Sequence, residues 1–221
     1  DYTRTSGGAY IRAVGPGSAR SDILRANITI GGDSNDEIYG LLIDGFVHTV
    51  TSDRLYAIKV GYGIVTQNTV SGSSDPMFLR MREFQCDYPK NGAFYGVVGT
   101  DFEFDGGYAH GGTNSAGAAF VAASSVSSLR LKGGRITGCQ GHGIISGAAD
   151  VTFEGMQIFT NGQATANTYS GILLQSASRD YQIVGVRSGS SSQKYGLAIS
   201  SGAEEYVETG NNFHDNATAG V

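Results

Sequence analysis

The sequence predicts an all-β protein folded as a parallel β-helix, with about nine coils of about 25 residues and three short strands in each coil. Three observations support this prediction. Glycine makes up 34 of the 221 residues, a glycine followed by a short apolar run recurs along most of the chain, and segments that alternate apolar and polar residues lie between these runs. No stretch shows the 3.6-residue period of an amphipathic helix.

The recurring glycine marks the first strand of each predicted coil. Neighbouring instances are 21 to 33 residues apart, a spacing that is typical of one solenoid turn. They are GLLI at Gly40, GIV at Gly63, GVV at Gly96, GAAF at Gly117, GII at Gly143, GILL at Gly171, GLAI at Gly196 and GV at Gly220. The competing fold, an antiparallel sandwich, predicts hairpin turns every 8 to 12 residues and gives no reason for this longer period.

A second strand follows each run and ends in glycine. The segments are NITIGG (27–32), DFEFDGG (101–107), LRLKGG (129–134), VTFEG (151–155), YQIVG (181–185) and YVETG (206–210). Because strand side chains alternate between faces, the apolar members are predicted to stack in inward columns, with Phe102 and Phe104 beside Leu129 and Leu131. Glu208 also falls on an inward position of this alignment.

A third element follows in some coils, as ITGC (136–139), IFTN (158–161) and FHDN (213–216). It places Cys139, Asn161 and Asn216 in one column. An asparagine there is expected to lie at a tight turn and to hydrogen-bond its own backbone or the neighbouring coil.

The composition excludes several classes of protein. With only three Pro and no G-x-y period, the chain is not a collagen rod, and its 40% hydrophobic content argues against disorder. The 15 Lys and Arg are spread along a chain of net charge −5, which argues against a nucleic-acid partner. No stretch approaches the ~20 apolar residues of a membrane-spanning helix, so membrane insertion is not expected.

The sequence predicts neither a metal nor a cofactor. Cys86 and Cys139 lack the spacing of a metal site and are interpreted as two buried thiols. GGDSNDEIYG (31–40) nearly matches the calcium-binding nonapeptide, but a single copy cannot build a site whose ions are shared between stacked repeats. That segment is interpreted as a turn.

The candidate catalytic residues are Asp101, Glu103 and Asp105, the densest acidic segment of the chain. They alternate with Phe102 and Phe104, so all three carboxylates are predicted to project outward along one strand. Residues i and i+2 of a strand lie ~6.6 Å apart and neighbours in adjacent coils ~4.8 Å. These separations overlap those between the paired carboxylates of glycosidases.

A structural role for the same acids is the alternative. The alignment places Glu103 beside Arg130, and Asp105 beside Lys132, which lies in turn beside Glu154. Such ion pairs contribute ~0.2–1 kcal/mol each and hold the register of the strands. A Lys132 that neutralises both acids would leave neither with the raised pKa that a general acid needs. In the catalytic interpretation, Glu154 is instead a substrate-binding residue.

Tyr108 and His110 are candidate substrate-binding residues, because GGYAHGG (106–112) directly follows the acids. A tyrosine ring can stack on a sugar and an imidazole can bond its hydroxyl groups. The alternative is a flexible glycine turn in which the tyrosine packs locally.

Arg80 and Arg82 in FLRMR (78–82) are predicted to point outward together. Guanidinium groups bind carboxylates in bidentate fashion, so these two residues are candidates for contact with an acidic polysaccharide. They can equally pair with nearby acids such as Glu83 or Asp87, or belong to a subunit contact.

The coil pattern of residues 20–221 resembles a known family, most clearly in YSGILLQSASRDYQIVGVRSGSSSQKYGLAISSGAEEYVETGNNFHDNATAGV (169–221). It looks like the right-handed parallel β-helix proteins, which include pectate lyases, polysaccharide epimerases and, most similar in texture, bacteriophage tailspike and tail-fibre depolymerases. The resemblance implies a right-handed, single-stranded β-helix that faces carbohydrate, and a homotrimer if it belongs to a phage tail. The DPHE motif of alginate epimerases is absent, as are the acidic calcium ligands and arginine base of pectate lyases, which weakens both assignments.

Three functions remain open on this basis. The first is a phage-type receptor-binding segment, in a virion tail or otherwise extracellular, that recognises bacterial capsule or lipopolysaccharide and degrades it as a glycoside hydrolase or lyase. The second is a non-enzymatic structural or adhesion β-helix, and the third is a monomeric bacterial polysaccharide lyase or epimerase. Because the chain starts at Asp1 and stops where another apolar run begins, we interpret residues 1–221 as one β-helix domain of a longer protein.

Overall fold

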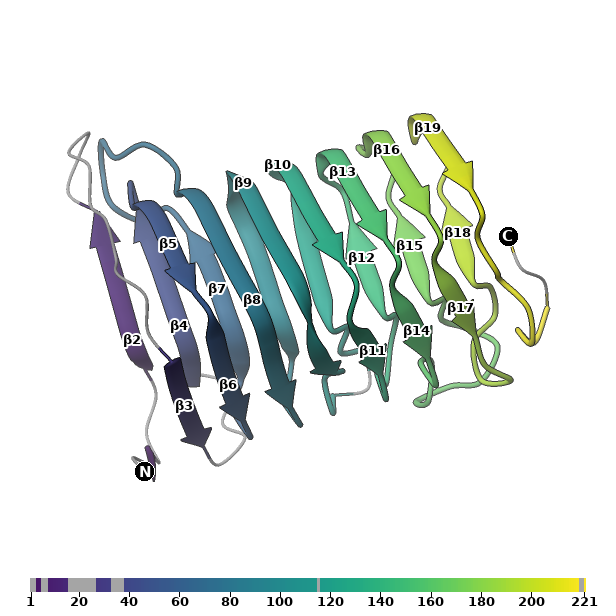
Figure 1. Cartoon of the computed structure of the whole chain (residues 1–221), viewed down its shortest axis with the longest axis horizontal. Helices are drawn as coiled ribbons and strands as arrows, with labels where there is room; N and C mark the ends of the chain where they lie inside the picture. The colour runs from purple at the N-terminus through teal and green to yellow at the C-terminus, as the bar shows by residue number, and fades with distance from the viewer. Residues whose placement is uncertain (1–2, 5–7, 16–26, 33–37, 115, 219–220) are drawn as a thin grey trace.

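The computed structural model describes residues 3–4, 8–15, 27–32, 38–114, 116–218 and 221. The described residues form an all-β parallel solenoid of about seven turns with about 26 residues in each turn. The turns follow one another along a rod from β2 at one end to β19 at the other (Figure 1). The predicted fold class is thus confirmed. No described segment is a helix long and apolar enough to cross a membrane.

The strands form three outer faces, and every pairing between them is parallel. Face A contains β2 (Gly8–Gly15), β4 (Ile38–Gly45), β7 (Tyr62–Gln67), the start of β9 (Gly92–His110), the start of β10 (Phe120–Lys132), β12 (Ile144–Ser146), β15 (Ile172–Leu174) and β18 (Leu197–Ile199).

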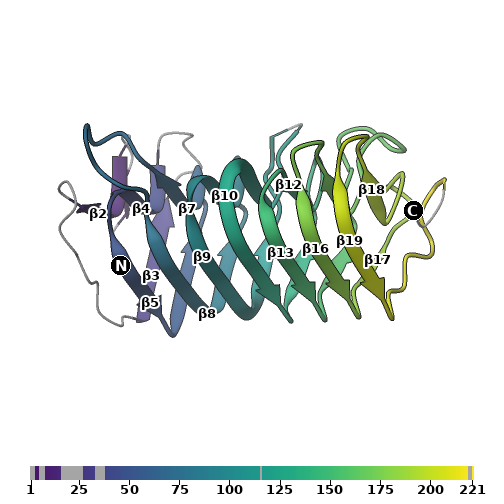
Figure 2. The ribbon, with the colours of Figure 1, turned by 90° about the horizontal axis from the view of Figure 1, so that it is seen from above.

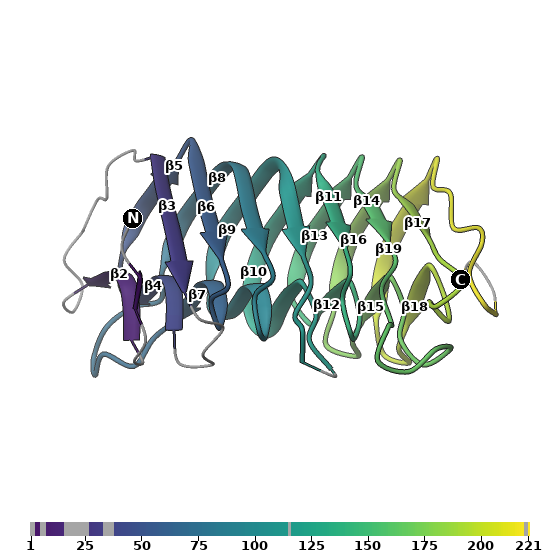
Figure 3. The same cartoon turned by 90° about the horizontal axis from the view of Figure 1, so that it is seen from below.

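Face B contains β5 (His48–Ser52), the start of β8 (Met77–Asp87), the middle of β9, the end of β10, β13 (Ala149–Glu154), β16 (Arg179–Val184) and β19 (Glu204–Thr209). Face C contains β1 (Thr3–Arg4), β3 (Asn27–Gly32), β6 (Arg54–Ile58), the ends of β8 and β9, β11 (Arg135–Thr137), β14 (Gln157–Phe159) and β17 (Arg187–Gly189). Figure 2 shows β10, β13, β16 and β19 side by side, and in Figure 3 the strands β11, β14 and β17 form a row separate from β12, β15 and β18.

The structure corrects the predicted alignment at two places. NITIGG (27–32) forms β3, which pairs with β6 on face C rather than with the strands of face B. On face A, Ile64 pairs with Phe94 and Phe94 with Phe120, so Gly96 and Gly117 do not mark the repeat position. Some turns contain long loops between their strands, such as the loop from Gln67 to Met77. The described residues form about seven turns, fewer than the nine predicted for residues 1–221.

The core is a continuous column of apolar side chains inside the three faces. The predicted inward pairs Phe102–Leu129 and Phe104–Leu131 are in register and buried. Five phenylalanines form the centre of this core, with ring centroids 5.0 to 6.2 Å apart; they are Phe84, Phe94, Phe102, Phe104 and Phe120. Edge-to-face arrangements at these distances add to the burial of apolar area.

The bends between faces carry residues with left-handed backbone conformation. In five successive turns, the bend from face B to face C begins with a glycine whose φ lies between 59° and 72°. These glycines are Gly106, Gly133, Gly155, Gly185 and Gly210. Glycine adopts this region without the steric penalty that a Cβ brings. The glycine excess of the sequence therefore reflects, in part, one repeated corner.

Polar groups are also buried in the rod. The Cys139 backbone N–H donates to Asn161 Oδ1 at 3.1 Å, and the Gln193 amide donates to Asn216 Oδ1 at 3.0 Å. The predicted column of Cys139, Asn161 and Asn216 is confirmed, with Gln193 inserted between the two asparagines. Both cysteines are buried free thiols, as predicted, and burial raises the pKa of Cys139 to about 12.

Candidate functional site

The outward side chains of face B form charged columns across adjacent turns. Arg80, Glu103 and Arg130 are in register with one another, as the alignment predicted for the last two. The neighbouring column continues from Arg82 through Asp105, Lys132 and Glu154; its register is also as predicted.

The ion pairs on this face differ from the predicted ones. Glu103 lies between two cations, with Arg80 Nε at 3.7 Å and Lys132 Nζ at 3.9 Å. Lys132 thus reaches diagonally to Glu103, and among the described residues it forms no ion pair with Asp105 or Glu154. The column Asp105–Lys132–Glu154 is in register but is not closed by ion pairs, because Lys132 points to the other column.

Asp101 occupies a bend rather than an alternating strand position. Its φ is 58°, in the left-handed region. In other turns, the residue directly before the first inward side chain of face B has the same conformation; these residues are Phe78, Ser128, Asp150, Asp180 and Glu205. Aspartate tolerates the left-handed region better than most residues because its short side chain can bond locally. Asp101 is therefore explained by the corner, and Glu103 and Asp105 alone project outward from the strand as predicted.

A shallow hollow nevertheless brings Asp101 and Glu103 together with cations. It has a volume of about 70 Å³ and is lined by Phe78, Arg80, Asp101, Phe102, Glu103, Ser128 and Arg130, which we call the face-B hollow. Ligand pockets for whole small molecules usually measure ~300–1,000 Å³. The face-B hollow can therefore hold a charged substituent of a sugar but not a complete ring.

Arg82 is in register with the second column, but its ion pair is with a residue outside that column. Its Nη1 lies 3.8 Å from Asp53 Oδ1, and the neighbouring Arg54 pairs with Glu83 at 3.0 Å. The predicted acidic partners for Arg80 and Arg82 were Glu83 and Asp87, whereas the structure pairs Arg80 with Glu103 and Arg82 with Asp53. Partners from adjacent turns replace the partners predicted from sequence proximity, because stacking brings residues one turn apart into contact.

Tyr108 and His110 lie in strand β9 on face C, beyond the bend at Gly106 and Gly107, and not in a flexible loop. Tyr108 is in register with Gln85 and Arg135. The acids and the Tyr108–His110 pair therefore occupy two neighbouring faces rather than one surface.

The surroundings of Tyr108 and His110 are rich in aromatic and titratable groups. The His110 ring lies 4.5 Å from the Tyr88 ring, and Tyr56 Oη donates to Asp87 Oδ2 at 3.0 Å. Burial raises the pKa of Tyr108, and the nearby Asp87 adds to this increase. Both effects favour the protonated hydroxyl group of Tyr108, which can donate a hydrogen bond.

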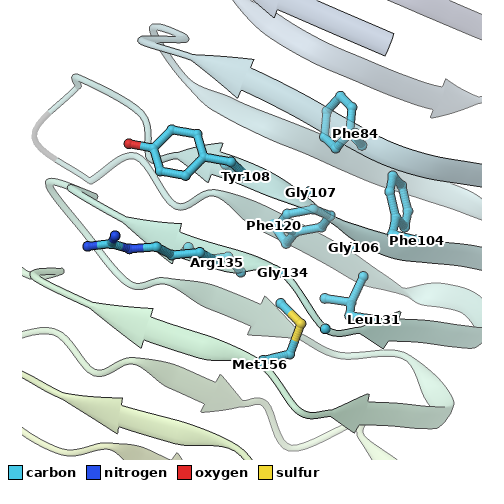
Figure 4. A pocket seen from close by; sticks show the side chains of 13 residues that line it. Phe84, Phe104, Gly106, Gly107, Tyr108, Phe120, Leu131, Gly134, Arg135 and Met156 are labelled. Carbon is cyan, nitrogen blue, oxygen red and sulfur yellow. The ribbon is translucent and has the colours of Figure 1, made fainter. Parts of the chain in front are cut away.

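A small cavity lies under the glycine corner that precedes Tyr108. Figure 4 shows Phe84, Phe104, Phe120 and Met156 on its inner side, while Tyr108 and Arg135 extend outward in the same direction. Its volume of about 20 Å³ admits one water molecule at most. The cavity arises because the glycines of this corner have no side chains to fill it, and it is too small for a ligand.

Sequence reasoning missed a stack of tyrosines on face A. The ring centroids of Tyr39 and Tyr62 are 6.1 Å apart, and those of Tyr62 and Tyr95 are 5.4 Å apart with an angle of 24° between the rings. A signal for part of this stack was present, since Tyr39 and Tyr62 each directly precede a repeat glycine.

Comparisons with known proteins add the following. No family model matches the chain, and no curated protein matches it significantly. Among solved structures, it is similar to the A-module of mannuronan C-5 epimerase AlgE6 from Azotobacter vinelandii, with 14% identity and a TM-score of 0.48 over 97% of this chain and 87% of that chain.

Proposed function

We propose that this β-helix binds an acidic bacterial surface polysaccharide, a capsule or a lipopolysaccharide, through the face-B hollow. The observation that carries the proposal is the position of Glu103 on an outward face, with Arg80, Arg130 and Lys132 around it. Guanidinium and ammonium groups can bind the carboxylates or phosphates of such a polymer. The carboxylates of Glu103 and Asp101 can accept hydrogen bonds from its hydroxyl groups.

The arrangement on face B suits a chain molecule. Arg80, Glu103 and Arg130 come from three successive turns, about 4.8 Å apart, so a polymer lying along the rod axis would meet a new side chain at each turn. All of these side chains are partly exposed, so contact requires no rearrangement of the core.

Cleavage of the bound polymer is the further part of the proposal, with Glu103 as general acid or base and Asp101 or Asp105 as its partner. Arg80 Nε and Lys132 Nζ lie 3.7 and 3.9 Å from Glu103, so both cations would lie beside the bond that this residue acts on.

The test is binding and oligosaccharide release with Glu103→Gln and Arg80→Gln. We expect weaker retention of acidic capsular polysaccharide for Arg80→Gln, and loss of oligosaccharide release for Glu103→Gln. Glu204→Gln, exposed on the same face but outside the hollow, is the matched control. Binding that is equal in the wild type and Arg80→Gln would remove the face-B hollow from the proposal.

A polysaccharide lyase or epimerase is the second candidate, and the register of Tyr108 with Arg135 favours it. Both reactions remove a proton next to a sugar carboxylate. An arginine can neutralise that carboxylate, while a tyrosine and a histidine can transfer protons. A lyase would release unsaturated sugars from a polyuronate, and an epimerase would invert C5 without breaking the chain. Either product, lost in Tyr108→Phe but kept in Glu103→Gln, would support this candidate over the first.

The biological setting is also a proposal. A phage tail or another extracellular location suits a protein that acts on bacterial surface polysaccharide, and a homotrimer is expected in the phage case. A monomer would agree with the lyase or epimerase candidate.

A further inference from the structure

Face A carries an open groove that is separate from the face-B hollow and from Tyr108. Its volume is about 410 Å³, and it is lined by Tyr62, Asn91, Tyr95, Asn114, Ala116, Gly117, Ala118 and Val121, which we call the tyrosine groove. This volume lies within the ~300–1,000 Å³ of typical ligand sites.

The tyrosine groove contains no charged side chain among its lining residues. One part of it consists of the stacked rings of Tyr62 and Tyr95, both partly exposed. Tyr95 is in register with Val121 in the next turn, which extends the apolar surface along the rod axis.

Two amide side chains supply the polar groups of the groove. Asn114 Nδ2 donates to Asn91 Oδ1, and within the described part of the chain this is the one side-chain hydrogen bond of the pair. The amide NH₂ of Asn91 and the carbonyl oxygen of Asn114 therefore remain for a ligand, one as donor and one as acceptor.

The segment that carries Asn114 is fixed to the turn before it. The Asn114 backbone N–H donates to Lys90 O at 2.9 Å, and Thr113 N–H donates to Pro89 O at 3.0 Å. A Cβ on Gly112 would lie 2.3 Å from Asn91 O, so this close approach requires glycine. The wall of the groove is thus formed before any ligand arrives, which lowers the entropy cost of binding.

We propose that the tyrosine groove binds an uncharged sugar segment of a polysaccharide. Pyranose rings have apolar faces that stack on aromatic rings and an edge of hydroxyl groups that both donate and accept hydrogen bonds. The stacked rings of Tyr62 and Tyr95 can pack against the apolar face of a sugar, and the amides of Asn91 and Asn114 can hydrogen-bond its hydroxyl groups. A charged sugar would find no ion-pair partner among the lining residues.

This inference extends the proposed function, since a heteropolymer with acidic and neutral residues could use face B and face A in different segments. The two proposals can fail separately. Binding at the face-B hollow depends on charge and should weaken with added salt. Binding at the tyrosine groove should be insensitive to salt and independent of Glu103.

The experiment is electrophoresis of the whole chain through gels that contain one polysaccharide each. The uncharged probes are hydroxyethyl cellulose, dextran, mannan and galactomannan, and the charged probe is polygalacturonate. We expect at least one uncharged polymer to retard the protein, and this retardation to persist in high salt. Tyr95→Ala and Tyr62→Ala should each weaken that binding about two- to tenfold, because each removes an aromatic ring on which a sugar face would stack.

Matched variants separate loss of binding from loss of folding. Tyr62→Phe keeps the ring and should retain most of the affinity, whereas Tyr206→Ala removes an exposed tyrosine of β19 on face B and should have no effect. Urea midpoints of all variants show whether the fold is intact. The proposal is overturned if no uncharged polymer retards the wild type, or if folded Tyr62→Ala and Tyr95→Ala bind as the wild type does.

Discussion

At Gly107 the backbone leaves no room for a side chain. Its φ is 105°, and a Cβ built there would lie 2.1 Å from Phe84 O of the preceding turn. The adjacent Gly106 has φ 72°, but a Cβ there would meet nothing within 4 Å. The two glycines of one corner therefore serve different purposes, since one permits a bend and the other permits two turns to approach.

This difference gives a prediction for the pair. Gly106→Ala should lower the free energy of unfolding by about 1 kcal/mol, the cost of left-handed backbone strain. Gly107→Ala should cost more than ~3 kcal/mol, because the overlap with the Phe84 carbonyl adds to the strain. Urea denaturation measures both values, and equal losses would contradict the assigned close contact.

Tyr181 is a buried residue whose replacement should stabilise the protein. Its side chain is fully buried, and among the described residues its hydroxyl has no hydrogen-bond partner. An unsatisfied buried hydroxyl costs ~1–3 kcal/mol, so Tyr181→Phe should raise the free energy of unfolding by about 1 kcal/mol. Tyr206→Phe, at the register neighbour that is 49% exposed, is the neutral control.

The same substitution should change the alkaline stability. Burial raises the pKa of Tyr181 from 10.0 to about 12, so between these pH values the unfolded chain loses the proton and the folded chain keeps it. The wild type is therefore destabilised as the pH rises through this window, and Tyr181→Phe should lose less stability there. Unfolding midpoints at pH 8 and pH 11 compare the two proteins.

At the scale of the element, a buried amide ladder holds the bend between face C and face A. Asn161 is fully buried, accepts from the Cys139 N–H, and donates from Nδ2 to Gln193 Oε1 at 3.2 Å. Each amide thus links one turn to the next, where an apolar residue would leave backbone groups unpaired.

Asn161→Ala should consequently destabilise the protein by about 2 kcal/mol, since it leaves the buried Cys139 N–H without a partner and removes one of the two hydrogen bonds that Gln193 Oε1 accepts from Asn161. Faster hydrogen exchange at the Cys139 amide should accompany the loss. Gln163→Ala, which removes an exposed amide from the same bend, should change the unfolding free energy by less than ~1 kcal/mol. An unchanged Cys139 exchange rate would argue against the ladder.

At the scale of the whole molecule, the tail-fibre interpretation predicts a homotrimer. Ile145 and Leu173 are in register and point outward on face A, where an apolar pair suits a subunit contact. Sedimentation equilibrium should then give three times 23.1 kDa for the wild type and a smaller mass for Leu173→Lys. Gln182→Lys, exposed on face B, should leave the mass unchanged, and a monomeric wild type would favour the lyase or epimerase candidate.

The sequence by itself determined the solenoid, the period of its turns, and the inward columns of face B, because burial of every second side chain imposes a pattern that is visible in one dimension. It also predicted the register of Glu103 with Arg130. Only the tertiary structure decided that Lys132 pairs with Glu103, that Asp101 serves a bend, and that Tyr108 lies on a different face from the acids. Stacking brings residues about 26 positions apart into contact, and the corners decide which face each side chain occupies. The alternation of apolar and polar residues along a strand contains no information on these contacts or on the choice of face. The tyrosine groove, which combines residues from several turns, therefore became visible only in the tertiary structure.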